Sequence, residues 1–199
     1  FSPGPMIMHH ISDDYSWHFF DIGSLHATLY LPVMVHKEGE GLIIFSSSKF
    51  SHGNHEYKGL IYDHGELKAA DNSAIYDFSI TKNVFAMLVS AILLILILMQ
   101  VAKTYRKREG MAPKGFQNFL EVIIIFLRDE LAKPIIGESK YERFFPFLLT
   151  VFFFIWLNNL MGLLPGAANV TGNIAVTAAL ALITFIITQV SGNKHYYQH

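Results

Sequence analysis

Cysteine is absent from the 199-residue chain, which excludes a disulfide framework, a thiolate zinc site and a cysteine nucleophile. Charge is absent from residues 144–193, a run of fifty positions without Asp, Glu, Lys or Arg. Soluble domains keep about a quarter of their residues charged and distribute them over the whole surface. A run of this length, rich in Phe, Leu and Ile, would leave a soluble helix or sheet without a solvated face. The sequence is therefore not that of a single ordinary soluble domain.

The charges that are present are unevenly distributed along the chain. The first eighty residues contain ten acidic and four basic residues, a net charge of −6. Residues 103–114 contain five basic residues against Glu109 alone, a net charge of +4. Because this single basic cluster is short and lies beside an apolar segment, the pattern argues against a nucleic-acid-binding protein.

The first eighty residues favour a small region of short strands and irregular segments. Apolar residues occupy the odd positions of Leu25–Val35, as expected of one strand with a buried face, and Pro32 indicates an edge strand. Glu38–Gly41 is a turn signal before a second strand at Leu42–Phe45. Leu60–Lys68 has the pattern of a further hairpin.

Three segments are long and apolar enough to cross a membrane, at about residues 83–102, 144–164 and 173–190. At 1.5 Å per helical residue, a segment of about twenty residues spans the ~30 Å hydrocarbon core of a bilayer. The alternative, buried helices of a large soluble core, fails because no other part of the chain could cover them. The predicted fold class is an α-helical integral membrane protein, with a small external β-rich region at 1–80 before a membrane domain at 81–199.

A fourth helical pattern differs from these three spans. Apolar residues follow helical spacing from about residue 115 to 132, but polar residues including Gln117 and Glu121 interrupt them. Pro134 follows the pattern and is expected to end the helix. We predict an amphipathic interfacial helix, lying at the membrane surface or folded back against other helices. The alternative is a true span that buries Glu121, at a cost of roughly a few kcal/mol.

The basic run after the first span predicts the orientation in the membrane. Lys and Arg concentrate in cytoplasmic loops, so residues 103–114 are expected in the cytoplasm. The acidic region 1–80 then lies outside, in a periplasm-like space. The short segment between the second and third spans, at 165–172, faces the same outer side.

Few polar residues lie in the predicted spans. Asn158 and Asn159 lie near the outer end of the second span, and Asn173 and Thr177 lie at the start of the third. One interpretation is a hydrated polar path near the outer leaflet. The alternative is structural, because Asn caps helix ends and Thr bonds the carbonyl four residues earlier in its own helix. Spacing alone favours the structural alternative.

Histidine is concentrated in the external region. Eight of the ten histidines lie in the first eighty residues, among them His9, His10, His52 and His55. Imidazole is a common ligand of zinc and copper, so a metal-binding external region is one hypothesis. The irregular spacing favours solvated surface histidines instead, and we expect no metal site. No nucleophile triad, phosphate-binding loop or paired carboxylate has a usable context, so we expect neither a catalytic site nor a cofactor.

Three segments in the second half of the chain carry more specific patterns. Ala112–Val122 contains Pro-x-x-x-Gln-x-x-x-Glu, and Asn158–Pro165 contains Asn-Leu-x-x-Leu-Leu-Pro. Thr171–Leu182 begins with Thr-Gly-Asn and continues as an Ala-rich helix. In their order, and with roughly forty residues between the first two, they resemble subunit a of the F-type ATP synthases. The resemblance covers residues 82–199.

The resemblance implies a stator subunit that lines two aqueous half-channels beside a rotating ring of c subunits. The implied partners are the c ring, subunit b of the peripheral stalk and the lipid bilayer of a bacterial inner membrane, without nucleic acid. The transported ion would be the proton, or sodium where the c ring selects it. The residues we expect to line a half-channel are Asn158, Asn159, Asn173 and Thr177, with Glu121 on the interfacial helix.

The chain also departs from the family it resembles. Many relatives have Asp at the position of Gly162 and an acidic residue at that of Asn173, so these protonatable groups are missing here. The family's essential Arg lies on a long tilted helix after the third span, where its fixed charge keeps the half-channels apart. No Arg follows Arg143 in this chain, so we expect a truncated, N-terminal portion of a longer protein.

The role of residues 1–80 and the overall function have alternatives. The acidic region could concentrate cations at a channel mouth, but packing against the peripheral stalk is the interpretation we favour. An alternative overall function is a membrane anchor or transporter subunit whose His-rich external region binds a metal. A purely structural membrane module is the third.

Overall fold

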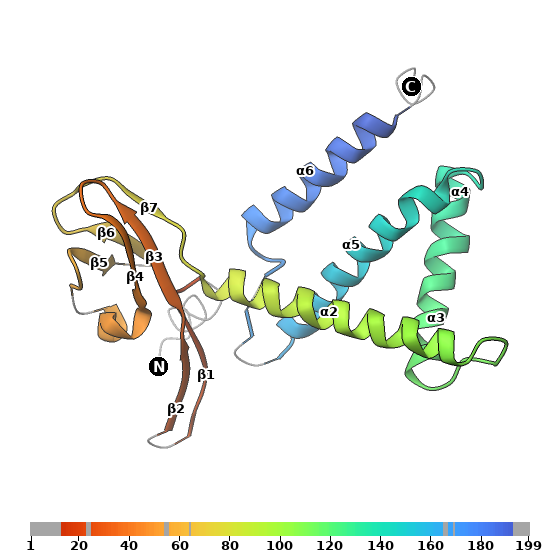
Figure 1. Ribbon diagram of the computed structural model, residues 1–199, viewed down its shortest axis with the longest axis horizontal. Helices are drawn as coiled ribbons and strands as arrows, with labels where there is room; N and C mark the ends of the chain where they lie inside the picture. Colours follow the sequence, from red (N-terminus) through yellow and green to blue (C-terminus); the bar gives the residue numbers. More distant parts are fainter. Residues whose placement is uncertain are drawn as a thin grey trace, which may run out of the picture. The chain divides into compact units, whose positions relative to one another are not determined.

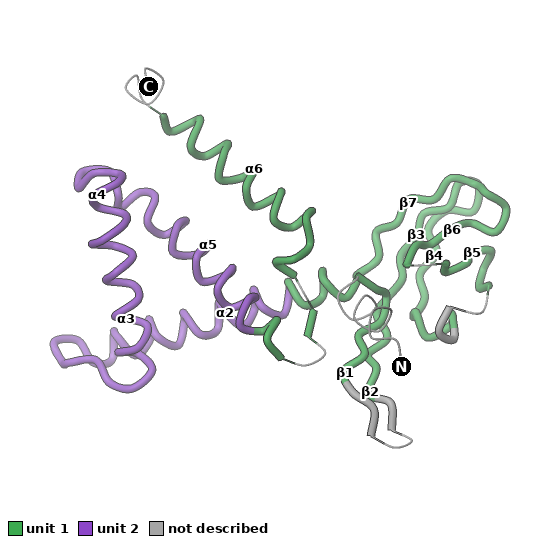
Figure 2. The backbone as a smooth tube through the Cα atoms, turned by 180° about the vertical axis from the view of Figure 1, so that it is seen from behind, with its two compact units in different colours: residues 1–87, 161–199 green, residues 88–160 purple. Residues whose placement is uncertain are grey.

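Figure 1 shows the computed structural model, which describes residues 13–22, 25–53, 56–63, 65–164, 167–168 and 170–192. The chain divides into two compact units, drawn in different colours in Figure 2. The first unit contains residues 1–87 and 161–199, and the second contains residues 88–160.

The strands in the described part of the first unit form three small antiparallel sheets. Their order is β1-β2, β4-β3-β7 and β5-β6. A 3-10 helix, η1 (Ser47–Gly53), follows β4. The strands are β1 (Ser16–Ile22), β2 (Leu25–Tyr30), β3 (Pro32–Lys37), β4 (Gly41–Ser46), β5 (Leu60–Asp63), β6 (Glu66–Ala69) and β7 (Ile75–Asp77).

The predicted hairpins are confirmed, but the single strand predicted at Leu25–Val35 is wrong. The turn before β4 and the β5-β6 hairpin lie where the sequence predicts them. Leu25–Val35 forms two strands, β2 and β3, that are separated by Leu31. The N–H of Leu31 donates to the carbonyl of Tyr15, and its carbonyl accepts from the N–H of Ser47, so Leu31 belongs to neither strand. The predicted edge strand at Pro32 is also wrong, since β3 is the central strand of its sheet. Proline is tolerated there because it is the first residue of the strand.

The core of this region is small and made by residues far apart in sequence. Val33 and Val35 of β3 are fully buried, which confirms the predicted alternation in this half of the segment. The remaining buried members of the cluster are Tyr15, Ile43, Phe50, Leu60 and Leu67. A core of this size depends on every member, because small domains bury little apolar surface per residue.

A buried lysine closes the far end of β3. Lys37 Nζ lies 2.6 Å from Glu40 Oε1 and 3.1 Å from Asp71 Oδ2. Hydrogen bonds from the hydroxyl and backbone N–H of Ser73, and then the bond from Lys37, hold the pKa of Asp71 well below its ordinary value of 3.8. The hydrogen bonds to Glu40 and Asp71 raise the pKa of Lys37 above 10.5.

Replacing Asp71 with asparagine should destabilise the β region at neutral pH and have a smaller effect in acid. The folded-state pKa of Asp71 lies below its unfolded value of 3.8, so its ionised form contributes stability above that value. This contribution is lost as the pH falls through the folded pKa. The measurement is thermal unfolding followed by circular dichroism at about pH 7 and about pH 3. Asp63→Asn is the control, because its ion pair with Lys68 is exposed. A variant difference that grows on acidification contradicts this prediction.

Among the described residues, three helices are long and apolar enough to cross a membrane: α2 (Lys82–Lys107), α5 (Tyr141–Gly162) and α6 (Ile174–Ser191). They coincide with the three predicted segments. Helix α2 continues beyond the predicted end into the basic run, whose positive charges interact favourably with the helix C-terminus. Helix α5 begins earlier than predicted, so Pro146 lies in its second turn and not in its first.

The fourth predicted helix is longer and less regular than expected. Helix α3 (Phe116–Phe126) continues through a π-helical turn (Leu127–Ala132) into α4 (Lys133–Ile136). Pro134 therefore does not end the helix, which is a correction to the prediction. In the wider π turn, the N–H of Lys133 donates to the carbonyl of Arg128, five residues earlier. The helix ends at Gly137, whose φ of 95° is left-handed and favours glycine.

The second unit has its own apolar core, built from three helices. Leu94 and Val101 of α2, Leu120 of α3 and Phe153 of α5 are buried together. The partly buried apolar side chains around them include Trp156, whose ring lies 6.1 Å from that of Phe119. Helix α3 is therefore packed against other helices along one side, while Val122 and Phe126 remain exposed away from Leu120.

Candidate functional site

The two asparagines of α5 lie on different sides of the helix, because successive helical residues are about 100° apart. Asn158 is buried, with 2% of its surface exposed, and its Nδ2 donates to the carbonyl of Phe154 at 2.8 Å. Asn159 is exposed, as are Phe152 and Ile155, which lie on the same face. The C-terminal end of α5 therefore has one buried and one exposed amide side chain.

The polar residues at the start of α6 organise the helix N-terminus. Asn173 is the N-cap, and its Oδ1 accepts a hydrogen bond from the N–H of Ala175 at 2.9 Å. Thr177 Oγ1 lies 3.2 Å from the carbonyl of Asn173 and 3.1 Å from that of Ile174. Thr184 and Thr188 donate in the same way to carbonyls one turn earlier. No residue of α6 is buried.

These hydrogen bonds are the ones that the structural alternative describes, and they leave further capacity. A threonine hydroxyl that donates to a carbonyl keeps its acceptor lone pairs, and an N-capping asparagine keeps its amide donors. Such groups can hold water molecules in a row without ionising. Asn158 and Asn159 belong to the second unit, whereas Asn173 and Thr177 belong to the first. The half-channel role of these four residues stays a prediction.

The segment before α6 is held by an apolar cluster that no local sequence pattern indicates. Trp17 of β1 is buried together with Ala86 of α2 and with Ala168 and Val170 of the loop before α6. Val176, in the first turn of α6, packs against them. We call this group the Trp17 cluster. The carbonyl of Val170 also accepts a hydrogen bond from the N–H of the N-cap residue Asn173 at 3.2 Å.

A polar junction joins the β region to the first turn of α2. Asp13 Oδ1 accepts from the N–H of Asn83 at 2.9 Å, and the carbonyl of Asp14 accepts from the N–H of Lys82 at 2.7 Å. These bonds satisfy two N–H groups that a helix leaves unpaired at its start. Tyr62 donates to Asp14 Oδ1 at 2.8 Å. Burial and then the charge of Asp14 raise the pKa of Tyr62 well above 10.0, so the phenol remains a donor.

The Gln and Glu of the first motif meet a tyrosine from α2. Tyr105 donates to Glu121 Oε2 at 2.5 Å, and the side chain of Gln117 is a further hydrogen-bond partner of Tyr105. Gln117 is buried, and its Oε1 has no hydrogen-bond partner within the described part of the chain. The helical spacing of Gln117 and Glu121 predicts that they share a face, but nothing local identifies Tyr105 as their partner.

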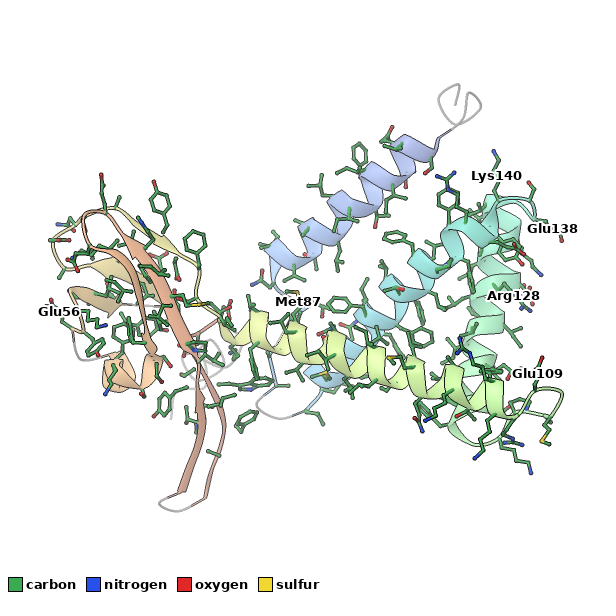
Figure 3. The ribbon with its side chains drawn as sticks, viewed as in Figure 1. Glu56, Met87, Glu109, Arg128, Glu138 and Lys140 are labelled. Atoms are coloured by element: carbon green, nitrogen blue, oxygen red, sulfur yellow. The ribbon has the colours of Figure 1, made fainter. Side chains whose placement is uncertain are left out.

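Charged side chains gather around the π turn and the loop that follows α4. Arg128 binds Asp129 through Nε and Nη2 at 3.0 and 2.9 Å, and Lys133 Nζ lies 2.7 Å from Asp129 Oδ1. The hydrogen bond from Arg128, followed by that from Lys133, lowers the pKa of Asp129. Figure 3 labels Arg128 here and places Glu138 and Lys140 in the connection between α4 and α5. These ion pairs stabilise the charged forms of Arg128, Asp129 and Lys133.

The histidines provide no metal centre in the part of the chain that the structure describes. Among those residues, no group of three or more His, Cys, Asp or Glu side chains could hold a metal ion. His9, His10, His55 and His64 lie outside the described residues. The metal-binding alternative therefore stays a hypothesis.

Comparison with known families divides the chain near the start of α2. The family model described as ATP synthase A chain matches residues 84–199. A second family model, described as Domain of unknown function (DUF8433), matches residues 6–85. The boundary between the two matches separates the β strands from the apolar helices.

Individual relatives are named ATP synthase subunit a or subunit a 2, and one of them matches nearly the whole chain. "ATP synthase subunit a 2" of Chlorobaculum tepidum is 37% identical over 203 residues, covering 99% of this chain and 46% of the relative. "ATP synthase subunit a" of Chloroherpeton thalassium is 50% identical over 117 residues, covering 58% of this chain and 35% of the relative. The protein of that name from Myxococcus xanthus is 45% identical over 131 residues, covering 65% and 43%. The chain thus spans less than half the length of these relatives. No solved structure matches it.

Proposed function

Because the chain belongs to the ATP synthase A chain family, we propose that it forms part of the ion-channel stator of a rotary F-type ATP synthase. In this role it lines part of an aqueous half-channel beside the c ring and contributes no catalytic group to ATP chemistry. The observation that carries the proposal is that the part of the chain matched by the family contains three helices of membrane-spanning length. Two of the three motif segments include the C-terminal end of α5 and the start of α6, and the first includes the start of α3.

The arrangement in the membrane follows from the charges. The basic residues at the end of α2 lie in the cytoplasm of a bacterial cell, and the β region lies in the periplasm. Helix α3 and the π turn lie at the cytoplasmic membrane interface, with the exposed Phe116, Val122 and Phe126 in lipid. Glu121, paired with Tyr105, stays near the headgroups. The c ring, subunit b of the peripheral stalk and the bilayer are the partners.

The polar ends of α5 and α6 are proposed to line the outer half-channel. Asn158 and Asn159 on α5, and Asn173 and Thr177 on α6, supply amide and hydroxyl groups that can hold water. Proton transfer along water needs hydrogen-bond donors and acceptors but no ionisable side chain at each position. Gly162 lies beside this segment, and a Cβ added there meets no atom within 4 Å. The backbone therefore has room for the Asp that many relatives have.

Replacing Asn159 with leucine, or Thr177 with valine, should lower ATP-driven proton pumping in the intact complex. Each substituted side chain is similar in size to the original but lacks the polar groups that would hold channel water. Each rise of about 1.4 kcal/mol in the free-energy barrier to proton transfer lowers the flux roughly tenfold. The measurement is acidification of inverted membrane vesicles by the full-length protein in its assembled complex. Loss of pumping with normal assembly is the expected result.

Matched controls separate this role from helix stability. Asn118→Leu removes an exposed asparagine from α3, and Thr150→Val removes a hydroxyl from α5 that bonds the carbonyl of Pro146 at 2.8 Å. Both controls should pump normally. If Asn159→Leu and Thr177→Val also pump normally, those residues are structural and the half-channel does not run there.

A further inference from the structure

One side of the β4-β3-β7 sheet packs on the core and the other side does not. Val33, Val35 and Ile43 lie in the core, so their neighbours along each strand point to the opposite side. We call this opposite side the outer sheet face. It consists of Met34, His36, Leu42, Ile44, Tyr76 and Phe78.

The side chains of the outer sheet face are neighbours in the ladder. Met34 pairs with Ile44, and His36 pairs with both Leu42 and Tyr76. The N–H of Phe78 donates to the carbonyl of Met34 at 2.9 Å, which continues the ladder by one position. Four of the six are strongly exposed apolar residues: Leu42 at 62%, Ile44 at 55%, Tyr76 at 62% and Phe78 at 64%. Contiguous apolar patches of this kind mark contact with a partner or a membrane.

The outer sheet face is joined to α2 at one end of β3. At the end near Pro32, the chain turns into α2, since the N–H of Ile80 donates to the carbonyl of Pro32 at 3.2 Å. The exposed turn with Glu38 and Glu40 lies at the opposite end. The first membrane-spanning helix therefore begins at the end of the face that is farther from this acidic turn.

The distance from this face to the membrane is short. Phe78 precedes Lys82, the first residue of α2, by four residues. An extended residue advances about 3.3 Å, so Phe78 lies within about 13 Å of the helix start and Tyr76 within about 20 Å. The headgroup layer on each side of the hydrocarbon core is on the order of 5–8 Å thick. Phe78 and Tyr76 therefore lie no more than a few such layer thicknesses from the start of the helix.

We propose that the outer sheet face lies on the lipid headgroup region beside the first span. The face is continuous in sequence with a lipid-exposed helix, and its aromatic residues are of the kind that anchor proteins at membrane interfaces. It has no charged side chain that would orient a protein partner. The contact would hold the β region against the bilayer. The proposal requires only that α2 crosses the membrane, and it does not depend on which ion the protein carries.

Depth-dependent quenching tests this contact directly. The chain contains no cysteine, so the substitutions Leu42→Cys, Ile44→Cys and Phe78→Cys each allow one fluorophore to be attached. Ile61→Cys is the matched control, an exposed apolar position on β5, outside the face. The full chain is reconstituted in phosphatidylcholine–phosphatidylglycerol vesicles that contain doxyl-labelled lipid, and iodide serves as the aqueous quencher. Circular dichroism of each variant confirms that the sheet is formed.

The expected result is that doxyl lipid quenches the labels at the three face positions at least about threefold more than the label at position 61, as for other interfacial contacts. Equal quenching at all four positions, with full access to iodide, overturns the proposal. Protection of the face positions from both quenchers in the assembled complex also overturns it, because a protein partner would then cover the face.

Discussion

Replacing Trp17 with alanine should destabilise the Trp17 cluster by about 3–5 kcal/mol, as expected for removal of a buried tryptophan side chain. Trp17 is 93% buried, since only 7% of its surface is exposed, and it contacts the first turn of α2 and the loop before α6. The change leaves a cavity lined by Ala86, Ala168 and Val170, which are too small or too constrained to fill it. The N-terminus of α6 should therefore loosen although Trp17 is distant in sequence.

Hydrogen exchange of the reconstituted protein measures this effect. The amides of Asn173 and Thr177, which donate to Val170 and Asn173, should exchange about 100-fold faster or more if the cluster opens. Tyr30→Ala is the control, because Tyr30 lies on the neighbouring strand β2 and is 41% exposed. Unchanged exchange at Asn173 and Thr177 in the Trp17 variant would show that the cluster does not hold this helix end.

If this prediction holds, the β region acts on the proposed half-channel through contacts and not through its charge. Asn173 and Thr177 follow Val170 of the Trp17 cluster by three and seven residues, and the carbonyl of Val170 accepts a hydrogen bond from the N–H of Asn173. A proton-pumping defect in Trp17→Ala would then resemble that of Thr177→Val, but it would come with faster amide exchange. The two variants together distinguish a residue that lines the channel from one that positions it.

The sequence was sufficient for the features that depend on local pattern. The three apolar helices were predictable because length and hydropathy are properties of each segment alone. The hydrogen bonds of Asn173 and Thr177 with their own helix were predictable for the same reason, since capping and bonding to the preceding turn are local.

Features that depend on distant residues were predicted wrongly or missed. The central position of β3 requires β7, about forty residues later in the chain, and no local signal in Pro32 reports that partner. Helix continuation through Pro134 depends on the π turn before it, because its wider hydrogen bonds tolerate a residue without a donor. Trp17 and Val170 are separated by more than 150 residues, so only the folded chain reveals their contact.

Replacing Val35 with aspartate should unfold the β4-β3-β7 sheet and leave the helical core of the second unit intact. Val35 is fully buried, and an unpaired carboxylate in such a position costs at least several kcal/mol. The free energy of unfolding of a small domain is about 5–15 kcal/mol, so this change removes most of it. The core formed by Leu94, Leu120 and Phe153 includes no residue of the β core. The β core should therefore unfold in this variant while the helical core of the second unit stays folded.

Hydrogen exchange and assembly together give the readout for this last variant. Amides of the β3-β4 ladder should lose protection in Val35→Asp, whereas those of α3 and α5 should keep theirs. Leu42→Asp is the matched control, because it places the same carboxylate on the adjacent strand but on the exposed side, 62% accessible. It should keep the ladder and lose only contact with lipid. Retained ladder protection in Val35→Asp contradicts the assigned core. If that variant unfolds the sheet and the full-length protein still assembles with the c ring, the β region serves in positioning α6 and not in assembly.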